Sequence, residues 1–189
     1  MARAKAKGRA RTSGRRTGAR KDAIALLKAD HRQVEQWFGQ FEKARDDQRK
    51  LQLATSICNA LKVHATIEEE VFYPAFIEAT EDKDLHHEAI VEHDGAKKLI
   101  AEIEASGPED DFYDAKVTVL SEMIKHHVKE EEQPGGMFAE ARKSDMDLAA
   151  LGEQMAARKS ELEAELGGAS MPPAVRRGRN GGVRVERRH

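Results

Sequence analysis

The chain has 189 residues, of which 39% are hydrophobic and 35% charged, and its formal net charge at pH 7 is −2. So high a charged fraction favours amphipathic helices with wide solvent-facing sides over buried strands. No apolar run approaches the roughly 18 residues of a membrane-spanning helix, and residues 1–21 lack the apolar core of a secretory signal. We therefore expect a cytoplasmic protein without a membrane partner. The single cysteine, Cys58, excludes a disulfide framework and a multi-cysteine metal site.

The near-neutral total hides an uneven distribution of charge. Residues 1–21 carry nine Lys or Arg and no acid, and residues 167–189 carry six Arg and one Glu. The segment between them, 22–166, carries 17 basic and 33 acidic residues. Neither end shows hydrophobic periodicity, and 167–189 is rich in Gly, Pro and Arg. The sequence therefore predicts two disordered basic tails, 1–21 and 167–189, on an acidic body.

Helical periodicity covers almost all of the acidic body, beginning at Asp22, which is a suitable N-cap residue. The predicted helices cover 22–45, 47–80, 84–105, the stretch from the acids at 109–111 to the Pro-Gly-Gly break at 134–136, and 137–166 with an interruption near Ser144. Short loops join antiparallel neighbours in helical proteins. The sequence therefore predicts an all-α, up-and-down four-helix bundle over 22–143 and an additional C-terminal helix over 144–166.

Two of the predicted helices carry a histidine and, four residues later, a glutamate on an otherwise aliphatic face. These faces read Ile57, Leu61, His64, Glu68, Val71, Ala75 and Leu120, Ile124, His127, Glu131. Residues four apart on a helix point in nearly the same direction. A carboxylate on a core face is costly unless it is paired or binds a metal. Two such pairs in matching register therefore indicate a shared metal site.

The first and third helices each add a histidine to their own apolar face, His31 and His93. The predicted set is then four imidazoles and two carboxylates without a thiolate, which suits a metal such as iron or manganese. Bundle interiors hold dinuclear carboxylate sites, and we expect Glu68 and Glu131 to bridge two metal ions. The acidic residues beside these ligands are expected to face solvent: Glu69, Glu70, Glu130 and Glu132.

The register of the fourth helix has an alternative. The face Val119, Met123, His126, Glu130 has the same spacing as the face that contains His127. The face with His127 is the more aliphatic of the two, but the spacing alone barely separates them.

A few other residues are candidates for the same site. Glu35 gives the first helix a His-x-x-x-Glu of its own, and His86 precedes His93 by seven residues on one helix face. We expect both to be exposed helix residues. Tyr73 and Tyr113 are within reach of the metals in a bundle of this kind, although a structural role in the core or at an interface is the commoner one for a tyrosine.

Four segments resemble the hemerythrin HHE cation-binding family, and most of all its actinobacterial hemerythrin-like proteins: LLKADHRQVEQWF, HATIEEEVFYPAF, HEAIVEHDGAKKLI and MIKHHVKEEEQPGGMF. The likeness spans roughly 22–143 and implies a four-helix bundle around two non-haem iron ions with an oxo or hydroxo bridge. It implies the ligands His31, His64, Glu68, His93, His127 and Glu131, and it selects the register with His127. Oxygen-carrying hemerythrins use a fifth histidine in this region, which this sequence does not obviously supply.

Ligands of this kind limit the chemistry to a few functions. Our first hypothesis is a di-iron protein that binds or turns over O₂, nitric oxide or peroxide, which includes enzymatic reduction of peroxide or nitric oxide. The second is a sensor of iron or oxygen without turnover, in which metal loss loosens the bundle. The third is a nucleic-acid-associated protein that contacts phosphates weakly through its basic tails. The acidic body would repel DNA, so we rank the third hypothesis lowest.

Overall fold

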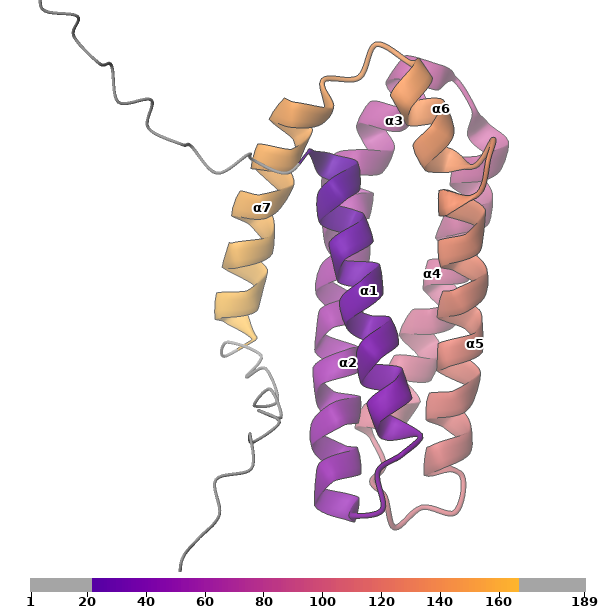
Figure 1. The fold of residues 1–189 in the computed structure, drawn as a ribbon, viewed down its shortest axis with the longest axis vertical. Coiled ribbons are helices and arrows are strands. Elements are labelled where there is room, and N and C mark those ends of the chain that lie inside the picture. The colour runs from indigo at the N-terminus through magenta and orange to yellow at the C-terminus, as the bar shows by residue number, and fades with distance from the viewer. Residues whose placement is uncertain (1–21, 167–189) are drawn as a thin grey trace, which may run out of the picture.

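The computed structural model describes residues 22–166, and within this range every regular element is a helix (Figure 1). In chain order the elements are α1 (Ala23–Phe41), α2 (Asp47–Ile67), the π-helical segment η1 (Glu68–Phe72), α3 (Tyr73–Thr80), α4 (Lys83–Glu104), α5 (Tyr113–Glu132), α6 (Met137–Lys143) and α7 (Leu148–Glu165). No helix in the described part of the chain is long and apolar enough to cross a membrane.

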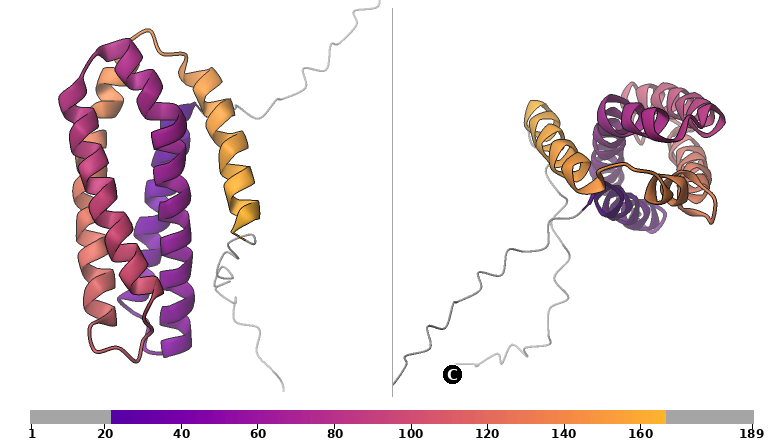
Figure 2. Two further views of the ribbon diagram at one scale, coloured as in Figure 1. Left: turned by 180° about the vertical axis from the view of Figure 1, so that it is seen from behind. Right: turned by 90° about the horizontal axis from the view of Figure 1, so that it is seen from above.

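Four long helical rods surround a common axis, and α2, η1 and α3 together make one of them (Figures 1 and 2). The rods follow one another around the axis as α1, α2–α3, α4 and α5, and each contacts both of its neighbours. The short helix α6 covers one end of the bundle, while α7 lies outside it against α1 and α2 (Figure 2). The predicted all-α, up-and-down bundle with an additional C-terminal helix is thus confirmed, whereas the two predicted tails lie outside the described residues.

Aspartate caps begin four of the helices. Asp22, Asp46, Asp82 and Asp147 each accept a hydrogen bond from the backbone N–H three residues later. Such a cap is worth about 1 kcal/mol to a helix. The predicted starts at 22, 47 and 84 lie within one residue of the observed starts at Ala23, Asp47 and Lys83, and the predicted interruption near Ser144 is confirmed by the gap between α6 and α7. The fourth rod begins at Tyr113 instead of among the acids at 109–111, because Asp110 accepts the N–H of Phe112 in the preceding turn.

The apolar interior is divided into two clusters along the bundle axis. One lies at the end where α1 and α2 join and contains residues such as Phe38, Ile57 and Leu120. The other lies under α3 and α6 and contains residues such as Leu27 and Phe76. On each rod the inward histidine falls between the two clusters. The fold therefore places one layer of titratable side chains across the middle of an otherwise apolar core.

The second rod contains one turn of π-helix, which the sequence did not predict. Its i→i+5 bond runs from the N–H of Tyr73 to the carbonyl of Glu68. The extra residue in this turn rotates the following side chains relative to a regular α-helix. Phe72 and Phe76 are fully buried, whereas Val71 and Ala75, which the α-helical spacing placed on the inward face, are only partly buried, and Val71 packs at the margin of the core.

Candidate metal centre

Four histidines, one from each rod, meet in the polar layer. His31, His64, His93 and His127 are each about 5% exposed or less. The Nε2 atoms of His31 and His64 are 3.1 Å apart, and those of His93 and His127 are 3.4 Å apart. The imidazoles thus form two pairs, each made by neighbouring rods, with the Nε2 atoms turned toward the bundle axis.

Two carboxylates lie between the histidine pairs. Glu68 Oε2 is 3.3 Å from His64 Nε2 and 3.4 Å from His93 Nε2. Glu131 Oε2 is 3.4 Å from His31 Nε2 and 3.7 Å from the same atom of His127. Both glutamates are buried, and none of their four carboxylate oxygens has a hydrogen-bond partner within residues 22–166. The structure therefore brings together all six residues that the sequence predicted as ligands, and it buries His127 while His126 stays exposed.

A second carboxylate faces the outer nitrogen of each imidazole. The Nδ1 atoms of three histidines hydrogen-bond to a carboxylate, His31 to Glu132 at 2.9 Å, His93 to Glu69 at 2.8 Å and His127 to Glu92 at 2.7 Å. His64 Nδ1 faces Asp30 at 3.6 Å, an ion-pair distance too long for a hydrogen bond. Carboxylates in this position orient the ring and make Nε2 a better ligand. The four outer carboxylates are Asp30, Glu69, Glu92 and Glu132.

The expectation that the acids beside the ligands face solvent is therefore wrong for two of them. Glu69 and Glu132 are only partly exposed and bind histidines of the neighbouring rods. Glu70 is an exposed residue that pairs with Arg158, as the expectation requires, and Glu130 is partly exposed beside His126. Helical periodicity places Glu68 and Glu131 inward and therefore assigns the acids adjacent to them in sequence to solvent. The next residue along a helix, however, lies on the side of the helix, where it faces the neighbouring rod.

The outer carboxylates follow a cyclic rule around the bundle. Each is adjacent in sequence to an inward ligand of its own rod, and each serves the histidine of the next rod. Asp30 on α1 faces His64, Glu69 on η1 binds His93, Glu92 on α4 binds His127 and Glu132 on α5 binds His31. The signal that could have revealed them is this pairing of an acid with the adjacent ligand, repeated on all four rods.

The hydrogen bonds determine which nitrogens are free to bind a cation. When Nδ1–H donates to a carboxylate, the neutral imidazole carries its lone pair on Nε2. Three imidazole lone pairs and two carboxylates then face one another beside His64 in an apolar interior, which requires cations or protons between them. Donor atoms at roughly 2.1 Å from a shared metal ion lie about 3.0–3.4 Å apart, close to the observed separations of 3.1 to 3.7 Å. The residues present fit a metal centre.

The pKa values of the buried histidines also indicate that this layer attracts cations. Burial opposes protonation of His64, but the charge of Glu68 and the contact with Asp30 outweigh it and raise its pKa to about 10. Burial likewise opposes protonation of His127, yet Glu131 and Glu92 raise its pKa to about 9. The carboxylates thus attract positive charge strongly enough to hold protons on these rings in the absence of a metal ion.

Of the further candidates, Tyr73 reaches the layer. Its hydroxyl is 3.3 Å from His93 Nε2, and the π-helical turn that precedes it places it inward. Tyr113 is buried in the distant apolar cluster against Phe41. Glu35 is exposed as expected, whereas the same expectation is wrong for His86, which is partly buried with its ring edge-on to Tyr73. Cys58 is buried, and its burial and the charge of Glu104 raise the thiol pKa to about 12.

A small apolar chamber adjoins the four imidazoles. Its volume is about 30 Å³. Apolar side chains close the side away from the histidines, and they include Val34, Leu61, Ile100, Ile124 and Val128. A cavity of this size admits only one or two molecules of the size of water.

The helix α7 is tied to the outer edge of the layer. Lys159 Nζ donates to Asp30 Oδ1 at 2.5 Å, and Arg158 binds Glu70 on η1 through two nitrogens at 2.7 and 3.2 Å. Because Asp30 also faces His64, α7 helps to fix one of the four outer carboxylates.

The chain is similar to known proteins of one cation-binding family. The sequence profile described as the hemerythrin HHE cation binding domain matches residues 22–134, more than half of the chain. A curated protein named DNA nickase, from Nostoc sp. (strain PCC 7120), is 28% identical over 148 residues that make up 76% of this chain. Those residues make up 40% of that protein, so this chain spans less than half of its length.

A solved structure shows the same fold. The crystal structure of a hemerythrin HHE cation binding domain-containing protein from Mycobacterium kansasii, a homologue of Rv2633c, superposes with a TM-score of 0.64. The two chains are 23% identical, and the superposition covers 77% of this chain and 89% of the other.

Removing an outer carboxylate should weaken metal binding without removing an inner ligand. Glu69→Gln leaves the six inward residues in place but weakens the acceptor for His93 Nδ1, and such changes typically lower metal affinity by about 10–100-fold. The adjacent Glu70→Gln is the matched control, because Glu70 contacts Arg158 instead of a histidine. Competition against a chelator of known affinity measures both variants. Equal affinities for the two variants would contradict the role assigned to Glu69.

The pKa values predict how pH acts on the metal-free protein. A group whose pKa is higher in the folded than in the unfolded protein stabilises the fold. This stabilisation is complete when the pH is below the unfolded-state pKa, and it is lost as the pH rises through the folded-state pKa. For His64 and His127 the ordinary value is 6.5 and the folded values are about 10 and about 9. The melting temperature of metal-free protein should therefore fall as pH rises from 6.5 toward 10, and that of metal-loaded protein should fall less. A metal-free melting temperature that rises over this interval would refute the assignment.

Proposed function

Because the chain belongs to the hemerythrin HHE cation-binding family, we propose that its polar layer holds two iron ions and that this centre binds or reacts with O₂, nitric oxide or peroxide. The family match confirms the resemblance noted in the sequence. One observation carries the proposal beyond cation binding: two buried glutamates without hydrogen-bond partners in the described chain lie between two pairs of imidazole Nε2 atoms.

The arrangement supports two ions instead of one. One group of mutually close donors consists of His31, His64, Glu68 and Glu131, and a second consists of Glu68, His93 and His127. Glu68 belongs to both groups, and Glu131 contacts a histidine of each pair. These shared positions suit carboxylates that bridge two metals.

The donor types support iron. Imidazole nitrogens and carboxylate oxygens without thiolate suit iron or manganese and disfavour soft metals. Iron in such a centre supplies an exchange between its ferrous and ferric states and a position at which a small ligand can bind.

The surroundings of the layer support a small, uncharged ligand. The apolar chamber of about 30 Å³ excludes organic substrates and disfavours charged ones. Burial and the charges of Glu68 and Glu131 raise the pKa of Tyr73 well above its ordinary value, so the phenol keeps its proton. Its hydroxyl, at 3.3 Å from His93 Nε2, is thus a hydrogen-bond donor at the edge of the centre.

Iron loading followed by spectroscopy tests this proposal. Protein loaded anaerobically with ferrous iron and freed of excess metal should contain two iron ions per chain, whereas His64→Ala and Glu68→Gln should lose most of this iron. Glu70→Gln is the matched control and should keep it. Absorption spectra recorded after addition of O₂, nitric oxide or peroxide, together with consumption of each ligand, identify the reaction. Ligand binding without consumption would favour a sensor, and wild-type iron content in both ligand variants would refute the centre.

A second candidate function is contact with DNA, which the relative named DNA nickase favours. The basic segments 1–21 and 167–189 would provide the phosphate contacts, since the body between them is strongly acidic. We expect such contacts to be weak and to disappear at high salt.

Incubation with supercoiled plasmid tests the second candidate. Iron-loaded protein that nicks DNA should convert supercoiled plasmid to the open-circular form at low salt, and a chain without residues 1–21 should do so more slowly. The metal-deficient Glu68→Gln protein should leave the plasmid supercoiled. If the wild-type protein leaves it supercoiled as well, and no mobility shift appears at low salt, this candidate is wrong.

A further inference from the structure

The metal centre lies between two apolar clusters, so a cation has to reach it from the side of the bundle. Besides the apolar chamber at the four imidazoles, hollows in the described part of the chain reach the polar layer from the sides, and two of them touch an inward histidine. One, of about 280 Å³, lies between α1 and α5 and reaches His31 and Glu132. The other, of about 10 Å³, lies between α4 and α5 and reaches His127 and Glu131. The two hollows differ in charge.

The wide hollow between α1 and α5 has a lining of mixed charge, with three cationic side chains, Arg32, Lys125 and Lys129, beside the carboxylates of Glu35 and Glu132. The narrow passage between α4 and α5 is lined by four carboxylates and, within the described residues, by neither Lys nor Arg; the four are Glu88, Glu92, Glu130 and Glu131. A lining of a single negative sign concentrates cations near it and raises their rate of association. The charge of the linings therefore favours the narrow passage as the route of a metal ion.

We propose that His126, Glu130 and Glu92 form a capture site for a divalent cation at the outer end of this passage and that the captured ion passes from there to the inner centre. This inference rests on the proposed function, because it requires a metal centre for the ion to reach. His126 Nε2 is 3.5 Å from an oxygen of Glu92 and 3.5 Å from an oxygen of Glu130. The three donor atoms lie within 4.8 Å of one another.

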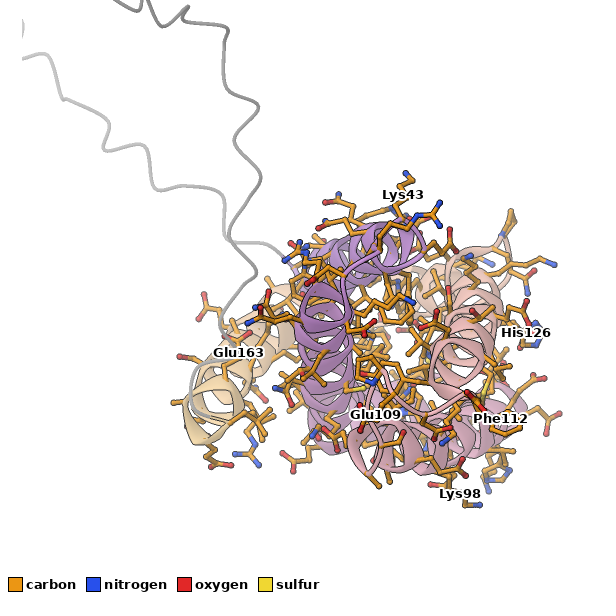
Figure 3. All side chains as sticks on the ribbon, turned by 90° about the horizontal axis from the view of Figure 1, so that it is seen from below. Lys43, Lys98, Glu109, Phe112, His126 and Glu163 are labelled. Carbon is orange, nitrogen blue, oxygen red and sulfur yellow. The ribbon has the colours of Figure 1, made fainter. Side chains whose placement is uncertain are left out.

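The outer end of the passage is open to solvent. His126 does not line the passage, but it contacts Glu92 and Glu130, which do. Its side chain is 60% exposed and lies on the outer rim of α5 (Figure 3). Three protein donors at the surface leave the remaining coordination positions of a cation to water, which gives weak and reversible binding. Such a site suits capture and transfer better than permanent storage.

The inner end of the passage offers a buried acceptor. Glu131 lines the passage, its side chain is 3% exposed, and both of its oxygens lack a hydrogen-bond partner in the described chain. Glu92 connects the two ends, since one oxygen faces His126 and the other accepts the Nδ1–H of His127 at 2.7 Å. A cation at the surface therefore has successive carboxylates on its way inward, from Glu130 and Glu92 to Glu131.

The rate of metal uptake tests the capture site. The double variant H126Q/E130Q removes two of its donors and leaves Glu92 and the six inner residues in place. The control H87Q/E122Q removes an exposed imidazole from α4 and an exposed carboxylate from α5. Neither residue lines the passage. Metal-free full-length proteins are mixed with Co²⁺, whose visible absorption reports entry into the centre, and with Fe²⁺ under anaerobic conditions. The final metal content is measured after removal of excess metal.

The capture site predicts a change in rate without a change in final content. H126Q/E130Q should take up either metal about tenfold more slowly at low salt, reach the same content as the wild type and show a weaker dependence on salt. H87Q/E122Q should match the wild type. Equal rates in both double variants, or a lower final content in H126Q/E130Q, would overturn the capture site. A wild-type protein that takes up neither metal would instead refute the proposed function.

Discussion

The structure depends on one electrostatic constraint: four imidazoles and two carboxylates occupy a layer that apolar side chains close above and below. Burying a carboxylate without hydrogen bonds costs free energy. A stable core does not tolerate two such carboxylates unless a positive charge compensates them. Glu68 and Glu131 are such carboxylates, and the raised pKa values of His64 and His127 show how strongly they attract positive charge. Positive charge between the rods is therefore a requirement of the fold itself.

The bundle meets this constraint through a repeated local device. Each rod presents one histidine inward and one acid sideways, and the acid serves the histidine of the next rod around the axis. A ring of this kind makes the orientation of every imidazole depend on the neighbouring rod, so the four rods have to assemble in one order. The external helix α7 reinforces the ring from outside, because Lys159 binds Asp30. Ligand geometry and bundle topology are thus stabilised by the same contacts.

The sequence predicts much of this arrangement, because helical periodicity and ligand spacing are local properties. The rods, the inward histidines and the His-x-x-x-Glu pairs at 64–68 and 127–131 follow from such spacing. The π-helical turn does not, since the extra residue at Glu68–Phe72 breaks the very periodicity on which the prediction relies. Tyr73 consequently reaches the centre and Val71 does not. The outer carboxylates depend on which rods are neighbours, so the sequence pattern places Glu69 and Glu132 toward solvent and identifies neither Asp30 nor Glu92.

Anomalous X-ray diffraction from crystals of iron-loaded protein, recorded on both sides of the iron absorption edge, tests the central claim most directly. The account predicts two iron peaks in the polar layer, one beside the Nε2 atoms of His31 and His64 and one beside those of His93 and His127, with Glu68 and Glu131 in contact with both. If the iron-loaded crystals show no anomalous peak in this layer, or if the peaks lie away from these nitrogens, the proposed di-iron centre is wrong.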